Sequence, residues 1–535
     1  MRKIRSNLEG IPKMMKKERV CLVGYITAAS ALVVLITLSR YCRYGMLGTT
    51  LLIGWDSPAY VWMAKYILAK GPINMAYAWS YPNLYGQLLA FLSYLAGDVV
   101  MVERILPLFF CILLIYANSE LVFRITKRVH VAGLTAFLTV LSVNVLRIFS
   151  DLHRNLMALS LSFVALLLIR SLNEEKSLLN KRYLSLIPLL LIIAGTQFET
   201  YFILSICLVL YAFFTRNIGK LIQLTFACVI PVAILVSLFP AYFLEYTSTV
   251  IVFQRELNVG EVLLWTGGSW ILLGFLLVGL SFFFKSKFWN NELSSLVFLW
   301  CLTILLTAFL IGTKIIPLSV DFVYRAFLLM PIPILLALAT LGYDDFIKQW
   351  QSKRSLSTKA KHLFHQLALS IVVFCLMATS VFVVVQHAGG FLTPYISRSS
   401  YEKMIATKGY FANNSLSPPI VVFRGHPLIW YVSLYRNYIG MEIGEHFAYY
   451  GDIENLLRLV PSEPKIRFDP YLSQLERYYI TFYFDELIGN ISGPTPPMYV
   501  HDSHITSVEE LMSHPIVLIA PEFYNEEIPY YLKPF

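Results

Sequence analysis

The stretch Gly54-Trp55-Asp56-Ser57-Pro58 separates two apolar segments of the chain. A long apolar segment, residues 20–39, ends shortly before it, and a second apolar run, residues 57–69, begins directly behind it. A carboxylate at the edge of hydrocarbon is costly to keep ionised, so Asp56 is a candidate functional residue. Asp56 or Ser57 would also suit the cap of a helix that begins at Pro58. The local sequence supports the two interpretations about equally.

The composition is that of a membrane protein. Of 535 residues, 57% are hydrophobic and only 14% are charged, whereas soluble domains carry about 25% charged residues. The seven cysteines show neither paired nor metal-type spacing, so they are expected to pack as small apolar side chains.

Eleven apolar segments are predicted to span the membrane, since about 20 residues cross a bilayer and shorter helices can cross where it thins. They are residues 20–39, 102–123, 131–147, 155–169, 184–198, 200–214, 220–239, 269–284, 295–312, 324–342 and 367–386. Residues 57–70 and 83–97 are instead predicted to lie on the outer surface as interfacial helices. The predicted fold class is therefore a polytopic α-helical membrane protein.

The distribution of basic residues predicts the orientation. With the N-terminus inside, the inner segments hold 23 Lys and Arg residues and the outer loops about nine, which follows the positive-inside rule. The chain then divides into a cytoplasmic segment, 1–19, a transmembrane domain, 20–387, with a first outer loop at 40–101, and an extracytoplasmic domain, 388–535. We expect a multi-pass protein of the cell membrane.

The last 148 residues differ in character from the rest. Residues 388–535 hold 10 Lys+Arg against 16 Asp+Glu, so the basic excess lies between the membrane segments, which argues against nucleic-acid binding. Short apolar runs at Ile420–Phe423 and Ile516–Ile519 predict buried strands, and residues 427–438 and 452–460 predict helices, which together indicate an α/β domain. His501-Asp502-Ser503-His504 could hold a metal, but a polar loop is favoured because no third ligand has suitable spacing.

Ionisable residues gather at the predicted outer ends of the membrane helices. These candidates are Asp56, Asp151, His153, Arg154, Glu199 and Arg325. Each has a purely structural alternative: Asp151 could cap the helix that starts at Asn155, Glu199 could lie in a solvated turn, and the arginines could reach lipid headgroups. Together, carboxylates and arginines at one leaflet suit a reaction that deprotonates a hydroxyl and stabilises a departing phosphate.

Several motifs occur in an order that resembles the GT-C superfamily of integral-membrane glycosyltransferases, over about residues 20–340. They are the Asp56 loop, Tyr81-Pro82-Asn83-Leu84-Tyr85, Glu103-Arg104-Ile105-Leu106-Pro107, Asp151, and Arg325 at the head of a helix that contains Pro331 and Pro333. Protein O-mannosyltransferases, the lipid A aminoarabinose transferase and oligosaccharyltransferase catalytic subunits belong to this superfamily, which uses polyprenyl-phosphate-linked sugar donors.

The resemblance implies a glycosyltransferase that moves a sugar from a polyprenyl-phosphate donor to an acceptor hydroxyl of a glycan, lipid or protein at the outer face. It implies that Asp56 is the catalytic base, Asp151 a supporting or metal-binding acid and Arg325 a contact to the donor phosphate. From their position at the outer helix ends, Glu199 is a further candidate for a supporting acid, and Arg154 and His153 are further candidates for binding the donor phosphate. Asp56, Asp151 and His153 could also share a divalent cation, because oxygen and nitrogen ligands suit one.

This sequence departs from the superfamily pattern at three places. At one of them, Tyr81-Pro82-Asn83 stands where some relatives carry a basic residue before a Pro pair, which argues against a phosphate contact there. The other two departures concern the acceptor. Asp56-Ser57-Pro58 stands in place of the Asp-x-Asp of oligosaccharyltransferases, and the tail lacks a Trp-Trp-Asp motif. Both departures argue against oligosaccharide transfer to asparagine, and the first weakens a metal requirement. The competing interpretation is a non-enzymatic polytopic membrane protein: a lipid or solute transporter, or a GT-C-like scaffold without activity. A transporter would place charges near the bilayer midplane in matching halves, and the sequence shows no such pattern.

Overall fold

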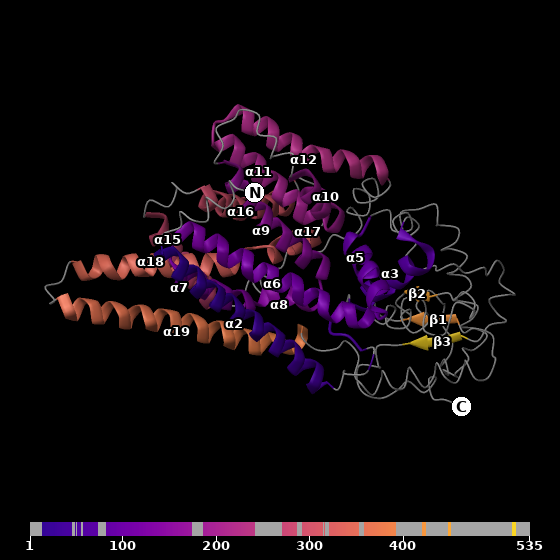
Figure 1. Ribbon diagram of the computed structural model, residues 1–535, viewed down its shortest axis with the longest axis horizontal. Coiled ribbons are helices and arrows are strands. Elements are labelled where there is room, and N and C mark those ends of the chain that lie inside the picture. Colours follow the sequence, from indigo (N-terminus) through magenta and orange to yellow (C-terminus); the bar gives the residue numbers. More distant parts are fainter. Residues whose placement is uncertain are drawn as a thin grey trace, which may run out of the picture. The chain divides into compact units, whose positions relative to one another are not determined.

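The structure is a computed structural model of the chain, and most of what it describes is helical (Figure 1). The described residues are 13–44, 49, 51–54, 57–72, 82–173, 186–240, 270–285, 292–313, 315, 320–352, 358–391, 420–423, 448–450 and 516–519. The helices that match predicted spans are α2 (Lys13–Arg43), α6 (Val99–Thr126), α7 (Val129–Val140), α8 (Val143–Ser150), α9 (His153–Asn173), α10 (Leu186–Thr196), α11 (Phe198–Phe214), α12 (Ile218–Leu238), α15 (Trp270–Lys285), α16 (Glu292–Gly312), α17 (Val320–Leu328), α18 (Ile332–Ser352) and α19 (Thr358–Phe391).

All eleven apolar segments predicted from the sequence fall on helices, as expected where hydrocarbon offers the backbone no hydrogen-bond partner. Within the described residues, five helices are long and apolar enough to cross a membrane, and up to seven spans result if each of two bent helix pairs counts as one. The other four predicted spans correspond to the shorter apolar helices α9, α10, α11 and α15. The chain is therefore a polytopic helical membrane protein.

Two predicted spans are bent in the structure. The helices α7 and α8 meet at 51°, and α17 and α18 meet at 53°. The second bend lies before Pro331, which has no N–H to donate and disfavours a helical residue in front of it. Side chains of neighbouring helices donate hydrogen bonds to the carbonyls at this bend. Asn144 Nδ2 donates to the carbonyls of Leu328 and Met330 at 3.2 and 3.0 Å, and Trp300 Nε1 donates to that of Leu329 at 3.0 Å.

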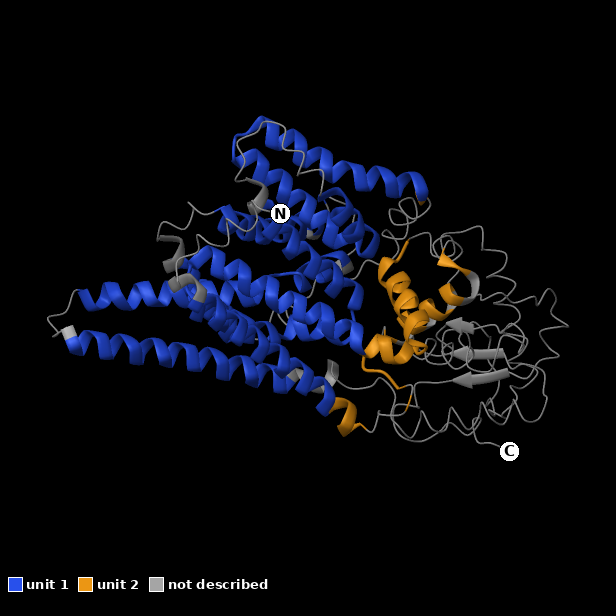
Figure 2. Cartoon of the chain, viewed as in Figure 1, with its two compact units in different colours: residues 1–39, 105–238, 250–392 blue, residues 40–104, 239–249, 393–535 orange. Residues whose placement is uncertain are grey.

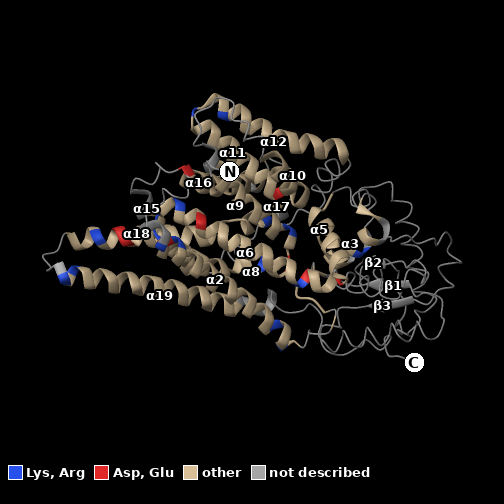
Figure 3. Cartoon of the chain, in the orientation of Figure 1, with Lys and Arg blue, Asp and Glu red and all other residues tan. Residues whose placement is uncertain are grey.

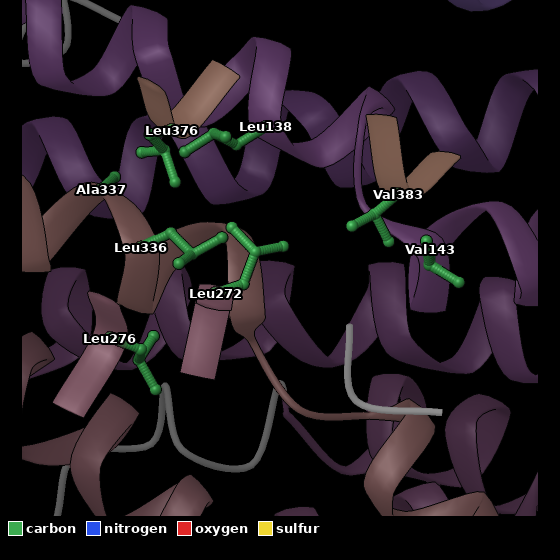
Figure 4. Close-up of a cluster of buried hydrophobic side chains, with 8 residues drawn as sticks. All are labelled: Leu138, Val143, Leu272, Leu276, Leu336, Ala337, Leu376 and Val383. Carbon is green, nitrogen blue, oxygen red and sulfur yellow. The ribbon is translucent and has the colours of Figure 1, made fainter. Parts of the chain in front are cut away.

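The described chain forms two compact units, coloured separately in Figure 2. Unit 1 comprises residues 1–39, 105–238 and 250–392, and contains most of the apolar helices. One of its apolar clusters joins five helices, α7, α8, α15, α18 and α19 (Figure 4). Its buried members are Leu138, Val143, Leu272, Leu276, Leu336, Ala337, Leu376 and Val383.

A buried carboxylate ties α18 to two other helices of unit 1. The Asp344 side chain is 4% exposed and pairs with Arg128 Nη1 at 2.8 Å, just before α7 begins. Lys348 Nζ lies 2.6 Å from the same oxygen, and His365 Nε2 of α19 lies 2.7 Å from the other. A carboxylate removed from water needs such partners to remain ionised, so this cluster joins the α7, α18 and α19 ends.

Unit 2 comprises residues 40–104, 239–249 and 393–535. The helices predicted at 57–70 and 83–97 are confirmed as α3 (Ser57–Lys70) and α5 (Leu84–Ala96), which pack against each other. Asn83 caps α5 from a left-handed conformation, with φ 41°, and its Oδ1 accepts from the Gly86 N–H at 3.3 Å.

The strands predicted in the C-terminal region are also confirmed. They are β1 (Ile420–Phe423) and β3 (Ile516–Ile519), joined by an additional strand, β2 (Ala448–Tyr450). The order is β2-β1-β3 and both pairings are parallel, so each connection must cross over rather than form a hairpin. The predicted helices 427–438 and 452–460 and the stretch His501–His504 lie outside the described residues.

Candidate functional site

Five of the six candidate residues belong to unit 1: Asp151, His153, Arg154, Glu199 and Arg325. The sixth, Asp56, lies outside the described residues. Two residues close to it in sequence, Gly54 and Ser57, are described and are buried in unit 2. Charged residues are sparse along the helices (Figure 3), so each buried ion pair among them needs a physical explanation.

The structure brings Glu199 and Arg325 together, although they lie 126 residues apart in the sequence. Arg325 Nη1 in the last turn of α17 donates to Glu199 Oε1 in the first turn of α11 at 3.1 Å. Gln197 is the extended residue before α11, and its Nε2 donates to the second oxygen of Glu199. The position at a helix N-terminus further stabilises the carboxylate.

The two partners of this pair differ in exposure. The Glu199 side chain is 4% exposed, so the interpretation of Glu199 as part of a solvated turn does not hold. The Arg325 side chain is 44% exposed. Glu199 therefore orients a guanidinium that an anion can still approach.

Asp151 forms a second ion pair, with Arg147, a residue that the sequence analysis did not select. Arg147 Nη2 lies 3.0 Å from Asp151 Oδ2, and the two side chains are only 15% and 2% exposed. Asp151 ends α8, and α9 starts at His153, so Asp151 does not cap a helix that starts at Asn155. The spacing of four residues was the available signal, since such pairs face each other on a helix.

His153, the first residue of α9, is bonded to the end of the preceding helix, α8. Its Nε2 lies 2.9 Å from the Phe149 carbonyl, which can only accept, so this nitrogen carries the proton. Nε2 is therefore not available as a metal ligand while this bond holds. Among the described residues, no group of three or more His, Cys, Asp or Glu side chains could hold a metal ion. Because Asp56 lies outside that search, a cation shared by Asp56, Asp151 and His153 stays a prediction.

The elements that carry the two ion pairs pack against one another. Contacts join α8 to α9, α9 to α11, α11 to α17 and α17 back to α8. Thr196 Oγ1, just before Gln197, lies 3.9 Å from Met157 Sδ, one turn beyond His153 in α9. The surrounding polar residues Ser150, Asn155 and Thr200 are buried as well. Unit 1 thus places two carboxylate–arginine pairs at the ends of neighbouring apolar helices, one of them buried and one with a half-exposed arginine.

No protein-family pattern matches the chain, and no curated protein matches it in sequence. Solved structures resemble it in fold. ArnT from Cupriavidus metallidurans, in the apo state, has a TM-score of 0.49 and 13% identity, over 77% of this chain and 84% of ArnT. Arabinofuranosyltransferase AftD from Mycobacteria has a TM-score of 0.45 and 14% identity, over 75% of this chain and 29% of AftD.

The archaeal oligosaccharyltransferase AglB from Archaeoglobus fulgidus, in complex with an inhibitory peptide and a dolichol-phosphate, has a TM-score of 0.47 and 12% identity, over 77% of this chain. The chain spans about 63% of the length of AglB. These structural neighbours are membrane glycosyltransferases of the GT-C superfamily. Because every one of these TM-scores is below 0.5, the functional proposal below rests on the residues of this chain.

Proposed function

We propose that the protein is a membrane glycosyltransferase that moves a sugar from a polyprenyl-phosphate donor to an acceptor hydroxyl at the outer membrane face. The observation that carries the proposal is the pairing of half-exposed Arg325 with buried Glu199, next to the helices that hold Arg147 and Asp151. An oriented arginine at the end of an apolar helix suits a phosphate attached to a lipid, because its guanidinium can donate two bonds to phosphate oxygens.

In the proposed reaction, an acceptor hydroxyl oxygen attacks the anomeric carbon of the donor sugar. A carbon–oxygen bond to the acceptor forms while the bond from the anomeric carbon to the phosphate oxygen breaks. Asp56 takes the hydroxyl proton as general base, and polyprenyl phosphate leaves with the bonding electrons. The assignment of Asp56 comes from the sequence resemblance.

Arg325 neutralises the charge that develops on the departing phosphate, with Arg154 and His153 as further donor contacts. Glu199 acts on the phosphate indirectly, because it holds the Arg325 guanidinium in place. Asp151 is a supporting acid whose charge is balanced by Arg147. A divalent cation at Asp56, Asp151 and His153 would require His153 to turn its Nε2 away from Phe149.

The topology that we propose has eleven spans in the cell membrane, with residues 1–19 in the cytoplasm and residues 388–535 outside. It follows from the 23 basic residues of the inner segments against about nine in the outer loops. In this topology the start of α11, the end of α8 and the end of α17 all face the outer leaflet, as does the loop that carries Asp56.

The experiment that tests the phosphate site compares Arg325→Lys with wild type in lipid nanodiscs. The probe is a fluorescent polyprenyl phosphate, and the matching neutral polyprenol serves as the probe control. Loss of one charge-assisted hydrogen bond costs about 1.5–3 kcal/mol, so the Kd for the phosphate should rise about 10- to 150-fold. The Kd for the polyprenol should not change.

Arg124→Lys is the matched control variant, because Arg124 also pairs with a glutamate, Glu120, at 2.7 Å, in the last turn of α6. It should bind the phosphate as wild type does. Equal affinity of Arg325→Lys and wild type for the polyprenyl phosphate would contradict the assignment and leave Arg325 as a headgroup contact. A chain that binds the lipid but never transfers sugar would support the transporter or inactive scaffold.

A further inference from the structure

The start of α6 carries two adjacent charged residues, Glu103 and Arg104, that the proposed reaction does not use. They bind different parts of unit 2. Tyr85 of α5 donates its hydroxyl to Glu103 Oε2 at 2.7 Å, and both residues are at most 1% exposed. Burial, and then the Glu103 carboxylate, raises the pKa of Tyr85 well above its usual value, so the phenol keeps its proton and acts as the donor. This pair fixes α5 against the start of α6.

Arg104 binds the chain that leads to Asp56. Its Nη2 donates to the carbonyl oxygens of Thr49 and Leu51, at 2.8 and 2.7 Å. The guanidinium also lies over the Tyr41 ring, 4.9 Å from its centre. One arginine at the start of α6 therefore binds both the end of α2, through Tyr41, and the chain that follows α2, through the carbonyls of Thr49 and Leu51.

The buried residues 51–53 need hydrogen-bond partners for their backbone groups. Leu51, Leu52 and Ile53 are 0%, 1% and 8% exposed, although they belong to a connection without helical structure. A buried carbonyl without a hydrogen bond is costly, and for that reason connecting segments usually stay at the surface. Arg104 provides one charge-assisted hydrogen bond to the carbonyl of buried Leu51, five residues before Asp56, and a second to that of half-buried Thr49.

We propose that Arg104 is a positioning residue, which fixes Thr49 and residues 51–54 and thereby the placement of Asp56 in the proposed transfer reaction. Only the expected effect of Arg104 on the rate of sugar transfer rests on the proposed function. The fixing of the segment is a separate, measurable property. Arg104 itself does not contact the reacting atoms in this proposal.

The test measures the segment directly, through Leu52→Cys in a protein whose exposed cysteines Cys21, Cys42 and Cys375 are replaced by serine. Labelling by a small maleimide is followed by mass spectrometry, with buried Cys111 in α6 as the internal control for global unfolding. Arg104→Met removes both hydrogen bonds, and losing even one charge-assisted hydrogen bond should accelerate labelling at position 52 by roughly tenfold or more. Labelling of Cys111 should not change.

Two further variants complete the design. Arg104→Lys retains a charge and a donor, so it should restore part of the protection. Arg43→Met is the matched control, because Arg43 is exposed and lies over the Tyr44 ring in the same unit. It should label at the wild-type rate. If labelling at position 52 does not respond to Arg104→Met, or if Cys111 responds equally, the inference is wrong.

The catalytic consequence has its own readout. Arg104→Met should lower kcat for sugar transfer while the Kd for polyprenyl phosphate stays at the wild-type value, whereas a general loss of structure would change both. Failure of the proposed function would look different, with faster labelling at position 52 but no sugar transfer by the wild-type protein. Faster labelling together with wild-type kcat would refute the positioning role.

Discussion

The packing of α15 against α18 gives a prediction whose size follows from the structure. A Cβ added at Gly279 of α15 would lie 2.6 Å from Ala339 Cβ and 2.7 Å from its backbone oxygen, well inside the ordinary contact range of 3.4–4 Å. The backbone oxygen cannot rotate away, so the two helices would have to separate. Overpacking of this kind costs about 1–3 kcal/mol, and alanine in a helix regains about 0.5–1 kcal/mol over glycine. From the midpoints of these two ranges, Gly279→Ala should therefore destabilise unit 1 by about 1 kcal/mol.

Gly274 provides the matched control in the same helix, because a Cβ at Gly274 would meet no atom within 4 Å. The assay is thermal unfolding in detergent with a thiol-reactive dye, since buried Cys111, Cys207 and Cys228 react only when the fold opens. At about 2–4 °C per kcal/mol for a large domain, Gly279→Ala should lower the Tm by about 2–4 °C. Gly274→Ala should leave it unchanged or slightly higher. Equal Tm values for the two variants would refute this packing of α15 and α18.

Two further predictions concern the ends of the helices. Asp344→Asn should destabilise unit 1 by about 1–3 kcal/mol. This is less than the cost of breaking a fully buried ion pair, because the Arg128 and Lys348 side chains are each 49% exposed. The control is Asp345→Asn, whose carboxylate makes no ion pair among the described residues, and equal stability of the two variants would contradict the cluster. For topology, a cysteine introduced near Asn413 should react with a membrane-impermeant maleimide on intact cells. Labelling that requires opened cells would refute an outer C-terminal domain.

The helices were predictable because a long apolar segment in hydrocarbon must bond its own backbone N–H and C=O groups, and an α-helix does so. Every predicted span coincides with a helix, and both interfacial segments are helical too. The bends were not predicted. The window 131–147 reads as one apolar segment, yet the chain breaks between α7 and α8. Pro331 did signal the second bend, but its partners Asn144 and Trp300 lie on other helices, and such contacts leave no local pattern.

In the candidate site, too, single residues could be selected from the local sequence, but contacts between distant residues could not be predicted. Glu199 and Arg325 could each be selected because a charge at a membrane helix end is unusual. Their pairing across 126 residues could not be predicted from either local sequence. Arg147 was missed for another reason. It is the last residue of the predicted span 131–147, whereas α8 continues to Ser150 and places Arg147 one turn before Asp151.

The central claim is tested most directly by the release of polyprenyl phosphate. Purified protein in nanodiscs is incubated with a mixture of polyprenyl-phosphate sugars extracted from host membranes, together with the glycolipid fraction of the same membranes as acceptor. Mass spectrometry then quantifies free polyprenyl phosphate in wild type and in Asp56→Asn. Wild type should release it, and the variant should do so roughly 10²–10⁴-fold more slowly, the contribution of a positioned general base, with an unchanged Kd for polyprenyl phosphate. Asparagine caps a helix as well as aspartate does, so release by the variant at the wild-type rate would contradict the catalytic role of Asp56. No release by wild type above a protein-free control would contradict the glycosyltransferase itself.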